Sequence, residues 1–192
     1  IERENRLRAV LILDLGHPAR DEIERLAPRH ARERAVSLAA LPHGGVEQAV
    51  LAVDAVLEAL DRALSSRQVA AFIVEPIQGK GVNLPTDEFL PGAAALCKKY
   101  GTIFIADEIQ TGIGRTGKFL AVEHWNVEPD MVLLAKALSG GHVPVGALLT
   151  RKSIFDKIFN QMDRAVVHGS TFAKNDLAMA AGIATLEVIK AD

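Results

Sequence analysis

Short apolar runs alternate along this chain with longer amphipathic stretches. The runs Ala9–Leu13, Val69–Val74 and Thr102–Ala106 have the length and the aliphatic content of buried strands. Thr102–Ala106 is unbroken by charge, as expected at the centre of a parallel sheet. Further strands are predicted at Met131–Ala135 and Val145–Thr150, with a weaker candidate at Ala35–Ala40.

The clearest helix is predicted at Val46–Leu64. Its apolar side chains recur at intervals of three and four residues, which places them on one helix face. They are Val46, Val50, Val53, Leu57, Leu60 and Leu64. Ala19–Glu33 is also expected to be helical, although Pro28 should bend or end that helix. Two more helices are predicted at Asp87–Tyr100 and Leu177–Ile189.

Strands that alternate with helices in this way are typical of a mostly parallel sheet covered by helices. The pattern therefore predicts an α/β fold. The 192 residues are enough for one domain with a core of its own, and they show no repeat, low-complexity tract or domain linker.

Composition and charge exclude some classes of partner. The chain is 49% hydrophobic with a formal net charge of −2, the balance of an ordinary soluble globular protein. Such a charge gives no electrostatic reason to expect binding to nucleic acid or to an anionic membrane. The basic cluster at Arg29–Arg34 has glutamates interleaved with it and is interpreted as a solvated helix face.

The cysteine count and the chain start bear on location. Cys97 is the one cysteine, which excludes an internal disulfide, and its place on a predicted helix indicates a buried thiol. Ile1–Asn5 is too charged for a signal peptide, and no apolar run approaches the ~20 residues of a membrane helix. We therefore expect a cytoplasmic protein.

Three groups of polar residues are assigned to strand ends, at the sheet edge where open α/β folds bind ligands. They are Asp107–Gly112, Lys136 and His168–Thr171. Taken singly, each has an ordinary structural interpretation as a turn former, a solvated lysine or a Gly-Ser-Thr turn. His142 and His168 lack the partner spacing of a metal site, so no metal is expected.

Together, the residues around these groups form five linked motifs. They are Val74–Gly79, Ile105–Gly112, Gly114–Lys118, Pro129–Gly141 and His168–Phe172. In this order and spacing they resemble the class III pyridoxal-phosphate-dependent aminotransferases. The loop His142–Pro144 is more similar to the ornithine aminotransferase branch than to other members. The resemblance implies the large domain of fold-type I pyridoxal-phosphate enzymes, with helices on both faces of the sheet.

The resemblance also implies pyridoxal 5'-phosphate as the cofactor and a catalytic role for two residues. Lys136 would form the Schiff base with the coenzyme and then act as the base of the proton shift, since a site can lower the pKa of a desolvated lysine. Asp107 would pair with the pyridinium nitrogen and keep the ring an electron sink. Gln110 would donate a hydrogen bond to the phenolic oxygen of the ring.

Three further residues complete the implied cofactor site. Ser170 and Thr171 would bind the coenzyme phosphate across the interface of a homodimer, and Glu75 would support the ring-binding residues. The substrates would be an amino acid or ω-amine and a 2-oxo acid. Arg115 is expected to organise a loop between turns at Gly114 and Gly117.

The resemblance covers residues 74–192, the predicted coenzyme-binding core, and leaves residues 1–73 as an unmatched α/β segment. No glycine-serine phosphate loop is recognisable in residues 1–73, and Lys80 stands where ornithine-type enzymes have a glutamate. An alternative function is therefore a catalytically incomplete binding or dimerisation module with the same fold. A nucleotide-binding domain ranks last, because Gly16-His17-Pro18 is not a glycine-rich turn.

Overall fold

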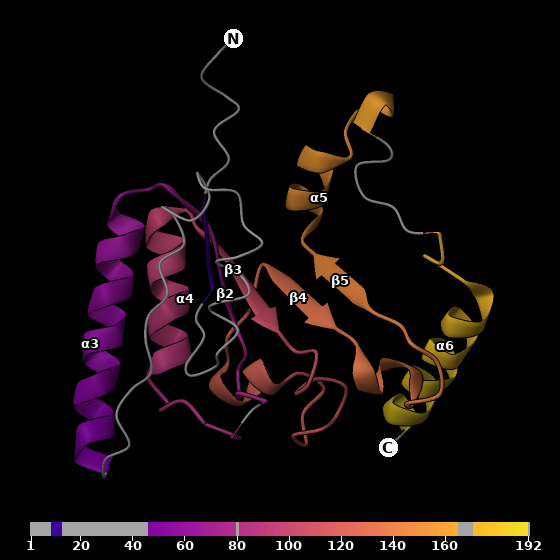
Figure 1. Cartoon of the computed structure of the whole chain (residues 1–192), viewed down its shortest axis with the longest axis horizontal. Coiled ribbons are helices and arrows are strands. Elements are labelled where there is room, and N and C mark those ends of the chain that lie inside the picture. Colours follow the sequence, from indigo (N-terminus) through magenta and orange to yellow (C-terminus); the bar gives the residue numbers. More distant parts are fainter. Residues whose placement is uncertain (1–8, 13–45, 80, 165–170, 192) are drawn as a thin grey trace. The chain divides into compact units, whose positions relative to one another are not determined.

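The computed structural model describes residues 9–12, 46–79, 81–164 and 171–191 (Figure 1). The predicted helix Ala19–Glu33 and the predicted strand Ala35–Ala40 lie outside these residues. The chain divides into two compact units. The first contains Ile1–Ala106 and Val122–Pro129, and the second contains Asp107–Ala121 and Asp130–Asp192.

Three parallel strands form the sheet of the first unit. They are β1 (Ala9–Ile12), β2 (Val69–Val74) and β3 (Ile103–Asp107), the last of which ends at the first residue of the second unit. β1 pairs with β2, and β2 pairs with β3 in a register that places Val74 beside Ala106. The predicted strands are confirmed, and β2 has the predicted bounds.

Two helices pack against each other in this unit, α3 (Val46–Ser65) and α4 (Phe89–Tyr100), and they lie side by side in Figure 1. Their buried side chains and those of the strands form the core: Leu60, Leu64, Phe72, Leu90, Cys97 and Phe104. The burial of Cys97 confirms the prediction of an interior thiol. α4 ends at Gly101, whose φ of 71° favours glycine.

The second unit contains an antiparallel pair of strands, β4 (Met131–Leu134) and β5 (Ala147–Thr150). A short helix, η2 (Lys136–Ser139), follows β4 and packs against α6 (Asp176–Ala191). The buried core of this unit is Ile113, Val132, Leu134 and Leu138. The remaining helices are η1 (Ala121–Trp125), α5 (Lys152–Ile158) and η3 (Met162–Arg164).

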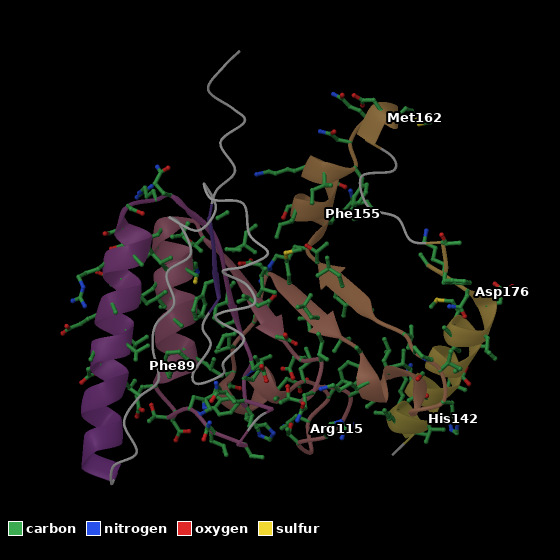
Figure 2. The ribbon with its side chains drawn as sticks, in the orientation of Figure 1. Phe89, Arg115, His142, Phe155, Met162 and Asp176 are labelled. Atoms are coloured by element: carbon green, nitrogen blue, oxygen red, sulfur yellow. The ribbon has the colours of Figure 1, made fainter. Side chains whose placement is uncertain are left out.

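Parallel pairing and intervening helices confirm the predicted α/β fold with mostly parallel strands. In the described part of the chain, no helix is both long enough and apolar enough to cross a bilayer. Figure 2 shows the side chains on this framework.

Candidate active site

Lys136 is the first residue of η2, two residues beyond the end of β4. Its φ of 47° lies in the left-handed region, which residues other than glycine adopt uncommonly. Its side chain is exposed. Strained backbone of this kind is concentrated at functional sites, because the surrounding structure must hold it in place. Five other described residues that are not glycine also have a positive φ, so this conformation is compatible with a functional role for Lys136 and does not single it out.

The structure brings Lys136 together with a second predicted residue, Gln110. The Nζ of Lys136 donates a hydrogen bond to Oε1 of Gln110 over 2.7 Å, although the two are 26 residues apart in sequence. Gln110 follows β3, and Lys136 follows β4. Two residues that were predicted from the ends of different strands thus share one site in the second unit.

Asp107 is the last residue of β3 and is half-buried. Its Oδ1 accepts a hydrogen bond from the backbone N–H of Ile109 over 3.1 Å. This is the local turn-forming role that an aspartate at a strand end commonly has. One carboxylate oxygen of Asp107 thus fixes the turn that contains Gln110, whatever further role the residue has.

The other three predicted residues are Glu75, Thr171 and Ser170. Glu75 belongs to the first unit, where its Oε2 accepts a hydrogen bond from the N–H of Gly79 over 2.7 Å. Thr171 is exposed at the start of a turn. Ser170 lies outside the described residues.

Lys136 lines a cavity of about 800 Å³ together with Arg115 and the loop that follows η2. Arg115 was expected only to organise its loop. The structure confirms the turn there, since the N–H of Gly117 donates to the carbonyl of Gly114 over 3.1 Å. It also places the Arg115 side chain, which is exposed, beside the candidate site. Arg115 was not among the candidates chosen at strand ends, because it lies within a loop.

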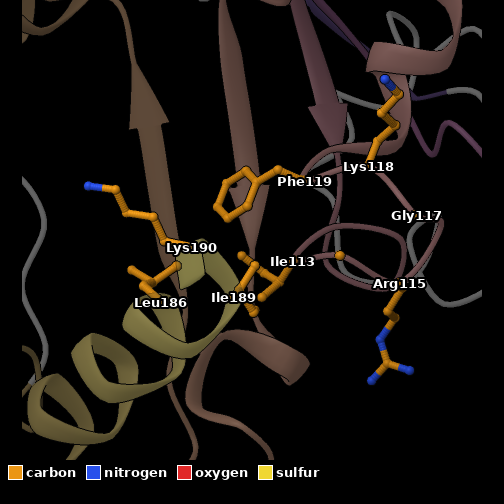
Figure 3. Close-up of a pocket in the computed structure, with 9 residues that line it drawn as sticks. Ile113, Arg115, Gly117, Lys118, Phe119, Leu186, Ile189 and Lys190 are labelled. Carbon is orange, nitrogen blue, oxygen red and sulfur yellow. The ribbon is translucent and has the colours of Figure 1, made fainter. Parts of the chain in front are cut away.

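A second hollow in the same unit contains none of the predicted residues. It is about 850 Å³ and its apolar side chains come from Ile113, Phe119, Leu186 and Ile189 (Figure 3). Lys118, Lys190 and Arg115 also line it, and the Arg115 side chain points away from the apolar side chains in this view. The two hollows are similar in size, so the choice of site rests on the chemistry of the lining residues.

The loop after Lys136 has the shape expected from its glycines. Gly140 ends η2 with φ 63°, and a Cβ at this position would lie 3.1 Å from Oγ1 of Thr185. The buried hydroxyl of Ser139 both donates to the carbonyl of Val143 and accepts from its N–H. Backbone and side chain together therefore fix the position of Lys136 relative to the loop.

Comparison with known proteins identifies the family. The family model described as aminotransferase class-III matches residues 25–192. The chain belongs to the class III aminotransferases. The match begins well before Val74, where the recognised motifs start, so it includes most of the N-terminal segment. The predicted boundary between residues 73 and 74 marks only the first of those motifs and stays a prediction.

Curated ornithine aminotransferases are similar to the chain over part of their length. The chain is 51% identical over 134 residues to an ornithine aminotransferase of Plasmodium chabaudi chabaudi, which is 69% of this chain and 31% of that protein. It is 51% identical over 135 residues to the mitochondrial ornithine aminotransferase of Rattus norvegicus, which is 70% of this chain and 30% of that protein. The chain therefore spans about a third of the length of these relatives.

Solved structures of aminotransferases share the fold. An ornithine aminotransferase from Plasmodium yoelii matches 97% of this chain and 40% of its own, with 36% identity and a TM-score of 0.71. An (S)-enantioselective ω-transaminase from Thermomicrobium roseum matches 95% of this chain and 44% of its own, with 30% identity and a TM-score of 0.79. The ornithine aminotransferase of Toxoplasma gondii, at 33% identity and a TM-score of 0.76, has pyridoxal phosphate partially occupying its active site.

The residues present fit pyridoxal 5'-phosphate by their chemistry. An exposed amine, Lys136, is already oriented by an amide side chain, and a half-buried carboxylate, Asp107, ends the neighbouring strand segment. The amine of Lys136 suits the aldehyde of the coenzyme. The carboxylate of Asp107 suits the coenzyme's ring nitrogen, which must stay protonated. The hydroxyl of Thr171 is exposed and is a suitable donor to a phosphate.

Proposed function

We propose that this chain is the coenzyme-binding part of a pyridoxal-phosphate-dependent aminotransferase. The reaction would move an amino group from an amino acid or ω-amine to a 2-oxo acid. The observation that supports this function best is the contact between Lys136 and Gln110, in a chain that belongs to the class III aminotransferases. It unites, around one amine, two residues from separate family motifs.

Lys136 has two tasks in this proposal. Its Nζ would hold the coenzyme through the carbonyl carbon, with loss of water. Once displaced by the substrate amine, it would take a proton from the substrate carbon and deliver it to the coenzyme carbon. The bound coenzyme supplies an electron sink for that proton transfer. The hydrogen bond to Gln110 orients the amine before the coenzyme arrives. Orientation of this kind lowers the barrier because less motion has to be arrested during the reaction.

Asp107 and Gln110 bind the coenzyme ring. The carboxylate of Asp107 accepts a hydrogen bond from the protonated ring nitrogen and stabilises its positive charge. The amide of Gln110 has both an acceptor oxygen and donor hydrogens. Its oxygen accepts from Lys136, so its NH₂ group can donate to the phenolic oxygen of the ring.

Thr171 and Ser170 bind the coenzyme phosphate, and Glu75 supports the residues that bind the ring. In this proposal the phosphate contact reaches the neighbouring subunit, so the active protein is a homodimer with shared sites. The cytoplasmic location expected from the sequence also stays a prediction, and two of the relatives are named as mitochondrial proteins.

The test is a reductive trapping experiment. The purified protein with pyridoxal 5'-phosphate should absorb in the visible, and borohydride should then fix the coenzyme to Lys136, as read by peptide mass spectrometry. Lys136→Ala should abolish the band and leave the fold intact. Lys118→Ala is the matched control, because Lys118 is an exposed lysine of the same unit. An adduct on Lys118 or Lys174 with none on Lys136 would refute the assignment.

A second step separates the enzyme from the incomplete binding module. An amine donor such as ornithine, added to the coenzyme-loaded protein, should convert the coenzyme to its amine form. A 2-oxo acid should then restore the original spectrum. A module that only binds the coenzyme would show the visible band and neither change.

A further inference from the structure

Glu108 is a buried carboxylate directly beside the candidate site. Its exposure is 1%, and that of Thr111 is 6%. The hydroxyl of Thr111 donates a hydrogen bond to Oε2 of Glu108. Burying a carboxylate is unfavourable unless it is hydrogen-bonded, so the Glu108–Thr111 pair is an arrangement that the fold maintains at a cost.

The backbone of Glu108 joins the same turn to β4. Its N–H donates to the carbonyl of Leu133 over 3.0 Å, and its carbonyl accepts from the N–H of Gly112 over 2.9 Å. Leu133 lies three residues before Lys136 along the chain, and Gln110 lies between Glu108 and Gly112. Glu108 is thus connected on one side to the strand that leads to Lys136 and on the other to the turn that contains Gln110.

Gly112 allows the turn to close on Glu108. A Cβ at this position would lie 2.9 Å from the carbonyl oxygen of Glu108 and 3.0 Å from Cδ2 of Leu134, which belongs to the core of the unit. The first distance is too short for a side chain. The turn can therefore lie this close to the end of β4 only with glycine at residue 112.

We propose that the Glu108–Thr111 pair is a positioning device that holds Gln110 against Lys136. This inference rests on the proposed function. The pair acts by fixing the turn from which Gln110 reaches Lys136 over 2.7 Å. Buried hydrogen-bonded residues behind a site determine whether its functional side chains are held in the productive geometry.

The experiment compares threonine variants by coenzyme affinity, which is measured from the visible absorbance during titration. Thr111→Val keeps the shape and removes the hydroxyl, and it should raise the Kd for pyridoxal 5'-phosphate up to about tenfold, the equivalent of one hydrogen bond. It should also lower the fraction of borohydride adduct found on Lys136. Thr111→Ser restores a hydroxyl and should restore both values.

Thr150→Val is the matched control. Thr150 lies on β5 of the same unit, and its buried hydroxyl has no hydrogen-bond partner among the described residues. Removing this hydroxyl should leave the Kd and the site of trapping unchanged. A Thr111→Val protein with a lower Tm but the affinity and trapping of the wild type would overturn the proposal, because the pair would then stabilise the turn and nothing more.

Variants of Glu108 keep the proposal testable if Thr111→Val does not fold. Glu108→Gln retains an oxygen that can accept the Thr111 hydroxyl, whereas Glu108→Met has a similar volume and no such acceptor. The Met variant should show the loss of affinity and the Gln variant should not; equal affinities would overturn the inference. Failure of the wild-type protein to form any adduct on Lys136 would instead contradict the proposed function.

Discussion

At the scale of single residues, Lys136 is the candidate catalytic residue although its backbone conformation lowers the stability of the fold. A left-handed φ costs a residue with a Cβ about 1–2 kcal/mol, and glycine avoids this cost. The lysine at this position therefore contributes strain to the fold.

This strain predicts the outcome of two substitutions. Lys136→Gly should be more stable than Lys136→Ala by about 1 kcal/mol, because only glycine relaxes the φ of 47°. The measurement is the free energy of unfolding in urea. The same two substitutions at Lys118, which does not have a positive φ, should show no advantage for glycine. An advantage of equal size at both positions would show that strain is not its source.

At Asp107, one substitution can remove the negative charge and keep the hydrogen bond that forms the turn. Asp107→Asn keeps an oxygen for the N–H of Ile109 but has no negative charge for the ring nitrogen. We expect an unchanged Tm and a loss of roughly 10³-fold in turnover, about 4 kcal/mol of barrier. Turnover, coenzyme Kd and Tm are measured on one preparation. Turnover and Kd that both stay unchanged in Asp107→Asn would limit Asp107 to the turn.

The sequence allowed the proximity of Lys136 and Gln110 to be predicted, because both follow strands and strand ends meet at one edge of a sheet. It did not reveal Glu108. A glutamate next to an aspartate is usually solvated, and its burial depends on how the following turn closes over it. That closure depends on tertiary packing around Gly112, which no local pattern encodes.

At the scale of elements, α3 and α4 are joined by a polar contact on their accessible side. The Oδ1 of Asp61 on α3 accepts hydrogen bonds from Nζ of Lys99 and from the hydroxyl of Tyr100, each over 2.9 Å. The hydrogen bond from Lys99, and then that from Tyr100, lowers the pKa of Asp61. The bonds to Tyr100 and Asp61 raise the pKa of Lys99.

These shifts fix the sign of a pH dependence. A carboxylate whose pKa is lower in the folded state stabilises the fold above its unfolded pKa of about 3.9, and the effect is lost as the pH falls through the folded value. Below about pH 4 the Tm of the wild type should therefore fall more steeply than that of Asp61→Asn. Because the contact is accessible to solvent, the difference should be small and should shrink in salt.

Asp54→Asn, on the same helix, is the control. Asp54 is exposed and forms no ion pair with a described residue. The Tm of Asp54→Asn should therefore fall below about pH 4 as steeply as that of the wild type. If the Tm of Asp61→Asn and that of the wild type fall equally below about pH 4, the contact adds nothing to stability.

Elements with a clear period were predictable, and short ones were not. α3 follows the spacing of its apolar residues, and the observed helix extends the prediction by one residue. α4 begins at Phe89, two residues later than predicted, and its Pro91 is tolerated because the first turn of a helix needs no N–H there. α5 and η2 have seven and four residues, too few to establish a period.

At the scale of the whole molecule, shared sites predict that coenzyme binding depends on protein concentration. If the phosphate contact comes from the neighbouring subunit, a free monomer lacks it, and dilution below the dimer Kd should weaken the visible band. Light scattering and absorbance are recorded on one dilution series.

Thr171→Ala should weaken coenzyme binding without moving the dimer equilibrium, since Thr171 is an exposed turn residue rather than part of a core. A monomer that binds the coenzyme tightly at every concentration would contradict the shared site. It would also indicate a phosphate site elsewhere in the same chain.

The last helix has a consequence for how the protein responds to temperature. α6 exposes several apolar side chains, with Leu177 at 69% and Val188 at 65%, and of its residues only Ala178 and Gly182 are buried. Exposed apolar side chains in this number are typical of a helix surface that another surface covers. Any contact that covers α6 is therefore held by the hydrophobic effect, which weakens on cooling. Assembly over this surface should become stronger as the temperature rises from that of a cold room to room temperature. A contact held by hydrogen bonds should respond in the opposite direction.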